Sequence, residues 1–221
     1  MKEGNSMNRS LQTAEPLGSA KPSSASYTIK ASIVLPPDTN HHGTIFGGKL
    51  MAYIDDVATI AATRHARRPV VTASTDSVDF LHPVKKGDAV CLSAFVTWTH
   101  HTSMEIFVRV VTEDLLTGER KVCATSFLTF VALDDSGRPA VVPGVYPETK
   151  EERRLYETAP DRKAARKIRR QESRQFAAYF GADYRLGQTP RSNLLQLVAE
   201  DKHEHEQPQL NSYASGWEAE W

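Results

Sequence analysis

The segment from Asn40 to Asp55, NHHGTIFGGKLMAYID, constrains the fold of this chain more than any other segment. A polar turn and two glycines, Gly47 and Gly48, come directly before a run in which apolar residues recur at helical spacing. This spacing predicts a helix from about Gly48 to His65 with one apolar stripe. The residues of the stripe are Leu50, Ile54, Val57, Ala58 and Ala61. Such a stripe has to be buried, so another layer of structure must cover it.

The glycine pair has two interpretations. Glycines before a helix often form a tight turn that lets the helix pack closely on a sheet. They also leave room for a substrate atom beside the first N–H groups of the helix, which are unpaired and lie at the positive end of the helix dipole. A developing oxyanion would be stabilised there. Neither the GxxxxGK[ST] nor the GxGxxG spacing of phosphate loops is present.

An acidic pair follows on the second turn of the predicted helix. Asp55 lies beside the apolar stripe, where partial desolvation favours the protonated carboxyl and suits a general base. Asp56 points in another direction, and we expect it to be solvated.

Strand-like runs surround this helix. The first run, from Tyr27 to Leu35, comes before the helix. The runs that follow the helix cover residues 70–81, 89–98, 103–112 and 121–133. Short turns connect them, which predicts an α+β fold with an antiparallel sheet wrapped around one long central helix. Alternation in the run 89–98 predicts one shared face, formed by Val90, Leu92, Ala94, Val96 and Trp98.

The two ends of the chain differ from its middle in composition. Residues 1–26 are rich in Ser, Pro, Ala and Gly, so we expect them to be disordered, with order beginning near Tyr27. Residues 144–221 form a charged extension that is predicted to be partly helical and then disordered. Within it, residues 150–175 favour a solvated helix interrupted by Pro160. Contact of its arginines with nucleic acid or an anionic membrane is the less favoured alternative.

Charge and cysteine content exclude several classes of function. Lys plus Arg and Asp plus Glu are both 27, so no net field favours nucleic acid, and we expect no such partner. Cys91 and Cys123 lie in apolar strand-like runs, which predicts buried reduced thiols. The eight histidines match neither HExxH nor zinc-finger spacing, so we expect no metal. No apolar run approaches a membrane span and no signal peptide is recognisable, which predicts a cytoplasmic protein.

Three motifs in order carry a resemblance to a known family. They are N-x-x-G-x-I-F-G-G-x-L-M-x-x-x-D at Asn40–Asp55, V-V-T-A-S-x-D-x-V-x-F-L-x-P-V-x-x-G-D at Val70–Asp88, and T-S-M-E-I at Thr102–Ile106. Over residues 27–143 the chain resembles the hotdog-fold acyl-CoA thioesterases. The fold of that family, a long helix cupped by an antiparallel sheet, agrees with the layout predicted above.

The resemblance implies hydrolysis of an acyl-CoA to a free acid and CoA, without a cofactor. It places the catalytic carboxylate on Asp55, as general base or nucleophile, and its polar partner on Asn40. Asn40, together with the helix start at Gly47 and Gly48, would orient water or stabilise the oxyanion. The family pairs two hotdogs side by side, so Asn40 of one subunit would face Asp55 of the other. This implies a homo-oligomer, expected to be a hexamer built as a trimer of dimers.

Two further residues are candidates for substrate binding. Thr72, taken by itself, is more typical of a strand surface than of a catalyst. Ser103 lies in the T-S-M-E motif and would contact the pantetheine or the nucleotide end of CoA. The family usually has Gly-Arg before this motif, whereas this chain has His100 and His101, which removes a fixed positive charge.

Two other functions remain open. A hotdog hydratase or dehydratase would need a histidine close to the acidic group, and His42 makes this possible. An acyl-CoA sensor would bind its ligand without hydrolysis and signal through the basic extension. The presence of Asp55 together with Asn40 favours catalysis, because a sensor needs no positioned base.

Overall fold

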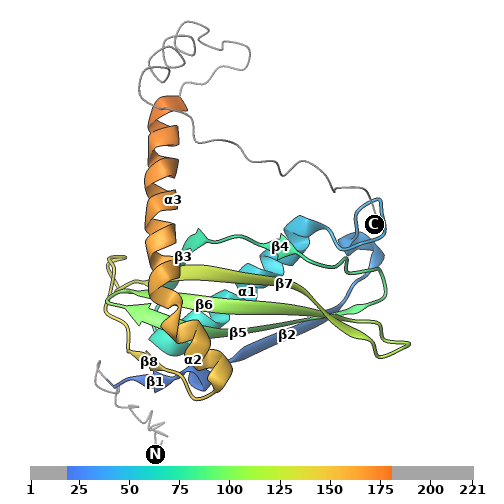
Figure 1. Cartoon of the computed structure of the whole chain (residues 1–221), viewed down its shortest axis with the longest axis horizontal. Helices are drawn as coiled ribbons and strands as arrows, with labels where there is room; N and C mark the ends of the chain where they lie inside the picture. Colours follow the sequence, from blue (N-terminus) through green and yellow to red (C-terminus); the bar gives the residue numbers. More distant parts are fainter. Residues whose placement is uncertain (1–18, 181–221) are drawn as a thin grey trace, which may run out of the picture. The chain divides into compact units, whose positions relative to one another are not determined.

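The fold is built on a six-stranded antiparallel sheet. The computed structural model describes residues 19–180, and its main sheet has the strand order β2-β5-β6-β7-β3, with β4 also paired to β7 (Figure 1). The strands are β2 (Thr28–Ile33), β3 (Val70–Thr75), β4 (Asp79–Phe80), β5 (Ala89–His100), β6 (Ser103–Glu113) and β7 (Arg120–Ala132). The long strands β5, β6 and β7 form consecutive hairpins, as predicted from the turns between them.

One long helix, α1 (Gly47–Ala66), packs against one face of this sheet (Figure 1). All five residues of the predicted stripe are at most 1% exposed. They meet the buried faces of β5 and β6, which carry Val90, Leu92, Ala94 and Val96 and then Met104, Ile106, Val108 and Val110. The predicted α+β layout, with the sheet around a central helix, is therefore confirmed. The helix ends at Arg67, which has a left-handed backbone (φ 52°) and donates its N–H to the carbonyl of Thr63.

Two further helices follow the sheet, α2 (Lys150–Glu157) and α3 (Ala159–Phe180). The Thr149 hydroxyl and the Glu152 carboxylate form a capping box that starts α2. Pro160 lies in the first turn of α3, where a missing N–H is tolerated, so the predicted interruption is confirmed. The chain divides into two compact units after Arg169, and residues 170–180 of α3 belong to the second unit.

The outer face of the sheet, opposite α1, is not free of contacts. Glu151 of α2 forms an ion pair with Arg109 of β6, and the Arg162 guanidinium lies 4.1 Å from the centre of the Phe127 ring. Arg166 is 7% exposed. The prediction of a solvated helix is therefore wrong for the start of α3, because one side of it packs on the sheet.

Order begins before Tyr27, which corrects the predicted boundary. β1 (Lys21–Pro22) pairs in parallel with β8 (Val145–Tyr146), and η1 (Ser23–Ser26) follows it. The Ser26 hydroxyl is fully buried and accepts the N–H of Val96 at 2.8 Å. This tertiary bond orders a segment whose composition is typical of disorder. The disorder predicted for residues 1–18 and for the end of the chain, residues 181–221, lies outside the described residues.

Two strand predictions also need correction. The run 70–81 is not one strand, because residues 76–78 interrupt the ladder between β3 and β4, and the side chain of Asp76 pairs with arginines of α3. In β5 the register shifts between Val96 and Trp98. This bulge turns Trp98 to the outer face, away from Val96, and Lys163 of α3 lies over its ring.

Both cysteines are free thiols, as predicted. Cys123 is buried, and this burial raises the pKa of its thiol to about 11. Cys91 is only half-buried, because it lies on the outer face of β5.

Candidate active site

The Asp55 carboxylate is held by a threonine from the edge of the sheet. Thr72 lies opposite Phe130 of β7, whose side chain is buried, so Thr72 points to the side of the sheet that carries α1. Its hydroxyl donates to Asp55 Oδ1 at 2.9 Å. Asp55 is half-buried, as its position beside the stripe predicts. Its Oδ2 accepts no hydrogen bond from residues 19–180, so this oxygen is available to a substrate or a water molecule.

Asp56 has a different environment from its neighbour. It is exposed, and its carboxylate forms an ion pair with Lys30 Nζ at 2.6 Å. An exposed charge that already has a counter-ion is poorly suited to accept a proton from substrate. The structure thus assigns the two carboxylates different environments, as predicted.

Asn40 organises the turn that leads to α1. Its Oδ1 accepts the N–H of His42 at 2.9 Å, and its Nδ2 lies 2.9 Å from the Thr44 hydroxyl. Its backbone N–H donates to the carbonyl of Thr44. Gly43 in this turn has a positive φ of 74°. These bonds fix the amide of Asn40 close to the start of the helix.

The start of α1 offers two free donors. Its N-cap residue, Phe46, has no side chain that could accept their hydrogen bonds. Among the described residues, the N–H groups of Gly47 and Gly48 donate to no acceptor. A Cβ on Gly48 would lie 2.6 Å from the Phe46 ring, whereas one on Gly47 would make only an ordinary contact with Phe80. The Phe46 ring is exposed and can turn aside, so this contact does not distinguish between the two interpretations of the glycine pair.

A cation lies beside these donors. Lys49 Nζ is 3.2 Å from Asp38 Oδ1, and it lies over the ring of Tyr53. The hydrogen bond to Asp38 raises the pKa of the Lys49 ammonium. The positive end of the helix dipole favours an anion at the start of α1, whereas the charge of Lys49 is already paired with Asp38.

The predicted residues form two separate groups within one chain. Asn40, Gly47 and Gly48 lie at the start of α1, which we call the turn group. Asp55 and Thr72 form the carboxylate group. Asp55 lies about two turns along the helix from Gly47, a rise of about 12 Å. No hydrogen bond joins the two groups in the part of the chain that the structure describes.

Ser103 belongs to neither group. It is adjacent in β6 to Met104, which shares a row with Phe130 and Thr72, so Ser103 points to the opposite face of the sheet. Its hydroxyl donates to the carbonyl of His100 at 3.1 Å and closes the β5–β6 turn. In this turn His101 has a positive φ of 43°. Contact of Ser103 with CoA stays a prediction.

Exposed apolar side chains near the turn group and the carboxylate group were not predicted from the sequence. They are Phe46, Met51 and Phe80, together with Val71, which is adjacent to Thr72 but points to the outer face of the sheet, and each is at least 46% exposed. Met51 lies one helical turn before Asp55, so its spacing could have indicated a position at the site. The exposure of Val71 and Phe80 depends on sheet position, which the spacing of residues does not reveal.

The described residues contain no group of three or more His, Cys, Asp and Glu side chains that could hold a metal ion. None of the helices within residues 19–180 is both long enough and apolar enough to cross a membrane. The absence of a cofactor stays a prediction.

Comparison with known proteins identifies the family that this chain resembles. Residues 42–119 match the model of the thioesterase superfamily. The uncharacterized acyl-CoA thioester hydrolase YkhA of Bacillus subtilis is 56% identical over 158 residues, which cover 72% of this chain and 92% of that protein.

Solved structures of similar proteins point to the same family. The acyl-CoA hydrolase of Staphylococcus aureus, solved in complex with butyryl-CoA, CoA and CoA disulfide, is 50% identical with a TM-score of 0.70, over 73% of this chain and 98% of that one. Variants of it with one aspartate, one threonine or one asparagine changed to alanine have also been solved. An apo-hexameric acyl-CoA thioesterase is 58% identical with a TM-score of 0.67, over 68% of this chain and 97% of that one.

The chain therefore belongs to the thioesterase superfamily, and within it to the hotdog-fold acyl-CoA hydrolases. The resemblance drawn from its three sequence motifs is confirmed.

Proposed function

We propose that this protein hydrolyses acyl-CoA thioesters to the carboxylic acid and CoA. The observation that carries the proposal is the half-buried Asp55 carboxylate, held by the Thr72 hydroxyl at one oxygen and open at the other. A carboxylate held in this way can accept a proton from an attacking water molecule. Family membership supports the same reaction class.

The spacing of residues in a relative supports the choice of site residues. In the Staphylococcus aureus enzyme, the asparagine and the aspartate that were replaced by alanine are 15 positions apart, and the aspartate and the threonine are 17 positions apart. Asn40, Asp55 and Thr72 have the same two separations and the same residue types. We therefore assign these three residues to the site of this chain.

The chemistry follows from the donors and acceptors available. Water adds to the thioester carbonyl carbon while Asp55 takes its proton, and the oxyanion is stabilised by the Asn40 amide and the N–H groups of Gly47 and Gly48. The carbon–sulfur bond then breaks, and Asp55 returns the proton to the CoA thiolate. Direct attack by Asp55, which would form a mixed anhydride that water then cleaves, is the second route.

The site is completed by a second subunit. The turn group and the carboxylate group are too far apart in one chain to act on one carbonyl. β3 is an edge strand of the sheet and is paired only with β7 among the described strands. Pairing of two subunits along this edge would bring Asn40 of one subunit to Asp55 of the other.

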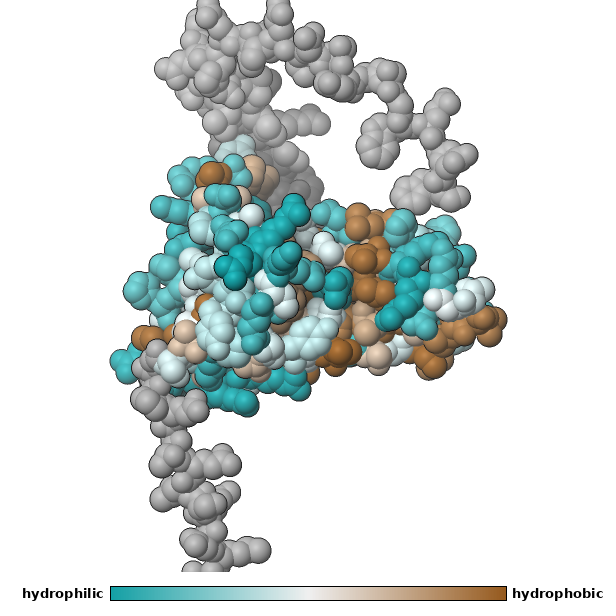
Figure 2. Space-filling view, turned by 60° about the horizontal axis from the view of Figure 1, so that its bottom comes forward, coloured by the Kyte–Doolittle hydropathy of each residue, from teal (hydrophilic) through white to brown (hydrophobic). Residues whose placement is uncertain are grey.

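Uncovered apolar surface also supports oligomer formation. The outer face of the sheet keeps exposed apolar side chains at Ile29, Ile33 and Val122. Figure 2 shows apolar surface, in brown, between hydrophilic regions on one side of the molecule. Association of subunits buries such surface. A hexamer, as in the 58% identical relative, is the assembly that we propose, and a cytoplasmic location stays a prediction.

The test is release of CoA thiol from short-, medium- and long-chain acyl-CoAs. Asp55→Ala should lower turnover by about 10² to 10⁴, because the general base is lost. Asp56→Ala is the matched control, since it removes an adjacent but exposed carboxylate, and it should leave turnover close to wild type. Wild-type protein that binds these acyl-CoAs without turnover would identify a sensor instead.

The hydratase alternative gains no support from contacts within one chain. His42 is exposed, and among the described residues its ring makes no hydrogen bond with Asp55. Its backbone N–H is held by Asn40 in the turn group.

A further inference from the structure

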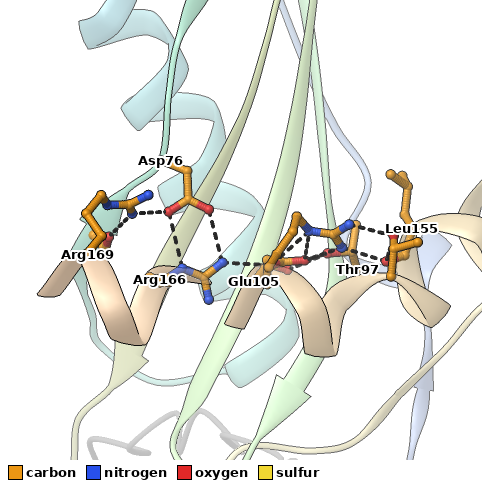
Figure 3. Close-up of polar contacts among 9 residues, drawn as sticks. Asp76, Thr97, Glu105, Leu155, Arg166 and Arg169 are labelled. Atoms are coloured by element: carbon orange, nitrogen blue, oxygen red, sulfur yellow. Dashed lines mark hydrogen bonds and ion pairs between the residues drawn. The ribbon is translucent and has the colours of Figure 1, made fainter. Parts of the chain in front are cut away.

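A buried charge lies under the C-terminal helix. Glu105 is on the outer face of β6 and is 1% exposed. Arg162 and Arg166 of α3 donate to its two carboxylate oxygens, each from Nη2 at 2.7 Å, and the Thr97 hydroxyl donates at 2.9 Å (Figure 3). Burial of a charge costs free energy unless it is paired and hydrogen-bonded, so the arginines of α3 offset the cost of burying Glu105.

The same helix reaches the strand that carries Thr72. Arg166 donates from Nε and Nη2 to the two oxygens of Asp76, at 3.2 Å each (Figure 3). Arg169 forms an ion pair with Asp76 and donates to the Ser74 hydroxyl at 3.2 Å. Burial acts to raise the pKa of Asp76, but the bonds from both arginines outweigh it and hold that pKa below its ordinary value.

β3 needs an anchor at this point. Its ladder with β7 is interrupted between Thr72 and Ser74, where a bulge leaves Ala73 without a partner. Among the described strands, no second strand supports its other side. The arginines hold Ser74, which directly follows the bulge, and Asp76, two positions further on, while Thr72 directly precedes the bulge.

We propose that Arg166 and Arg169 are positioning residues, which hold β3 so that the Thr72 hydroxyl meets the Asp55 carboxylate. This rests on the proposed role of Asp55. The start of the C-terminal extension is then part of the catalytic architecture, although it contacts neither member of the carboxylate group directly.

Arg169→Ala is the variant best suited to test this. Its side chain is 45% exposed, so its removal leaves no buried charge without a partner. Lys167→Ala is the matched control, because Lys167 has the same charge and an exposed position on the same helix. Arg166→Ala would also remove one of the two arginines that pair with the buried Glu105, and its effect would include a loss of folding stability.

A double-mutant cycle with Thr72→Ala separates positioning from general destabilisation. Arg169→Ala should lower kcat by about tenfold with little change in KM, and by less than about twofold when Thr72 is already Ala. Arg169→Lys should restore part of the loss. An equal loss of kcat in both backgrounds would overturn the inference, because the arginine would then act independently of Thr72.

Amide hydrogen exchange of residues 70–75 provides a readout that does not depend on turnover. We expect faster exchange in Arg169→Ala and no change in Lys167→Ala. Absence of wild-type turnover would refute the proposed function, whereas unchanged exchange in Arg169→Ala would refute the anchoring of β3.

Discussion

Asp55 and Asp56 show how one position along a helix decides the chemistry of a side chain. Asp55 shares the edge of the buried stripe and meets Thr72, while Asp56 points to solvent and pairs with Lys30. The helical period predicted this difference, because adjacent residues are rotated by about 100° around the axis. It did not identify Thr72 as the partner of Asp55.

His65 should make the stability of the fold depend on pH. It is fully buried in the last turn of α1, with Nε2 2.9 Å from the Pro143 carbonyl oxygen, so Nε2 donates and carries the proton. Nδ1 has no partner among the described residues. Burial, with a smaller contribution from the charge of Lys21, lowers the pKa of His65 below its ordinary value of 6.5.

The neutral ring is therefore favoured in the folded state. Its contribution to stability is complete above the ordinary histidine pKa and is lost as the pH falls below it. The free energy of unfolding should decrease between about pH 7.5 and about pH 5.5, and this decrease should be smaller in His65→Gln. His82→Gln, at an exposed position, is the control. Urea unfolding at the two pH values measures the effect, and an unaltered pH dependence in His65→Gln would contradict it.

Among the strands and helices, the short strand β3 contributes both to the proposed site and to the proposed contact between subunits. It has an open edge, an exposed Val71 and the Thr72 hydroxyl, and it is interrupted by a bulge. Edge strands that remain open are normally protected by charge or by a partner. The lack of a charge on Val70–Thr75 indicates a partner.

Val71→Lys should therefore separate the subunits. A lysine on this edge opposes strand pairing, so we expect smaller particles in analytical ultracentrifugation and a parallel loss of turnover. Val141→Lys, which replaces another exposed valine, should retain both the assembly and the activity. Normal assembly of Val71→Lys would mean that the subunits do not pair along β3.

The whole molecule should be active only as an oligomer, because each chain supplies one turn group and one carboxylate group. Mixed Asn40→Ala and Asp55→Ala subunits should recover about a quarter of wild-type turnover, since random pairing in two-fold dimers gives half heterodimers with one intact site each. A mixture of Thr72→Ala and Asp55→Ala should recover nothing, because both changes lie in the same group.

This complementation is measured after subunits have exchanged under mild denaturation, with exchange checked by native mass spectrometry. Mixed oligomers without recovered turnover would place the complete site within one chain.

Much of the fold was predictable from local patterns. The helical stripe, the hairpins of β5, β6 and β7 and the break at Pro160 each depend on residues within a few positions of one another. The predictions that were wrong depend on distant contacts. The bulge at Thr97 turned Trp98 to the outer face, and the bond between Ser26 and Val96 ordered a segment with the composition of a disordered one.

The sequence by itself determined the α+β layout, the burial of one face of α1 and the position of Asp55 beside that face, since periodicity and turn chemistry act over short distances, and its family motifs added Asn40 as a candidate. Only the tertiary structure decided that Thr72, 17 positions away, bonds to Asp55, that Ser103 lies on the opposite face, and that Glu105 pairs with Arg166 across 61 positions. Those contacts depend on strand register and on how α3 docks. Register and docking are set by the packing of the whole chain, and no spacing of residues along it records them.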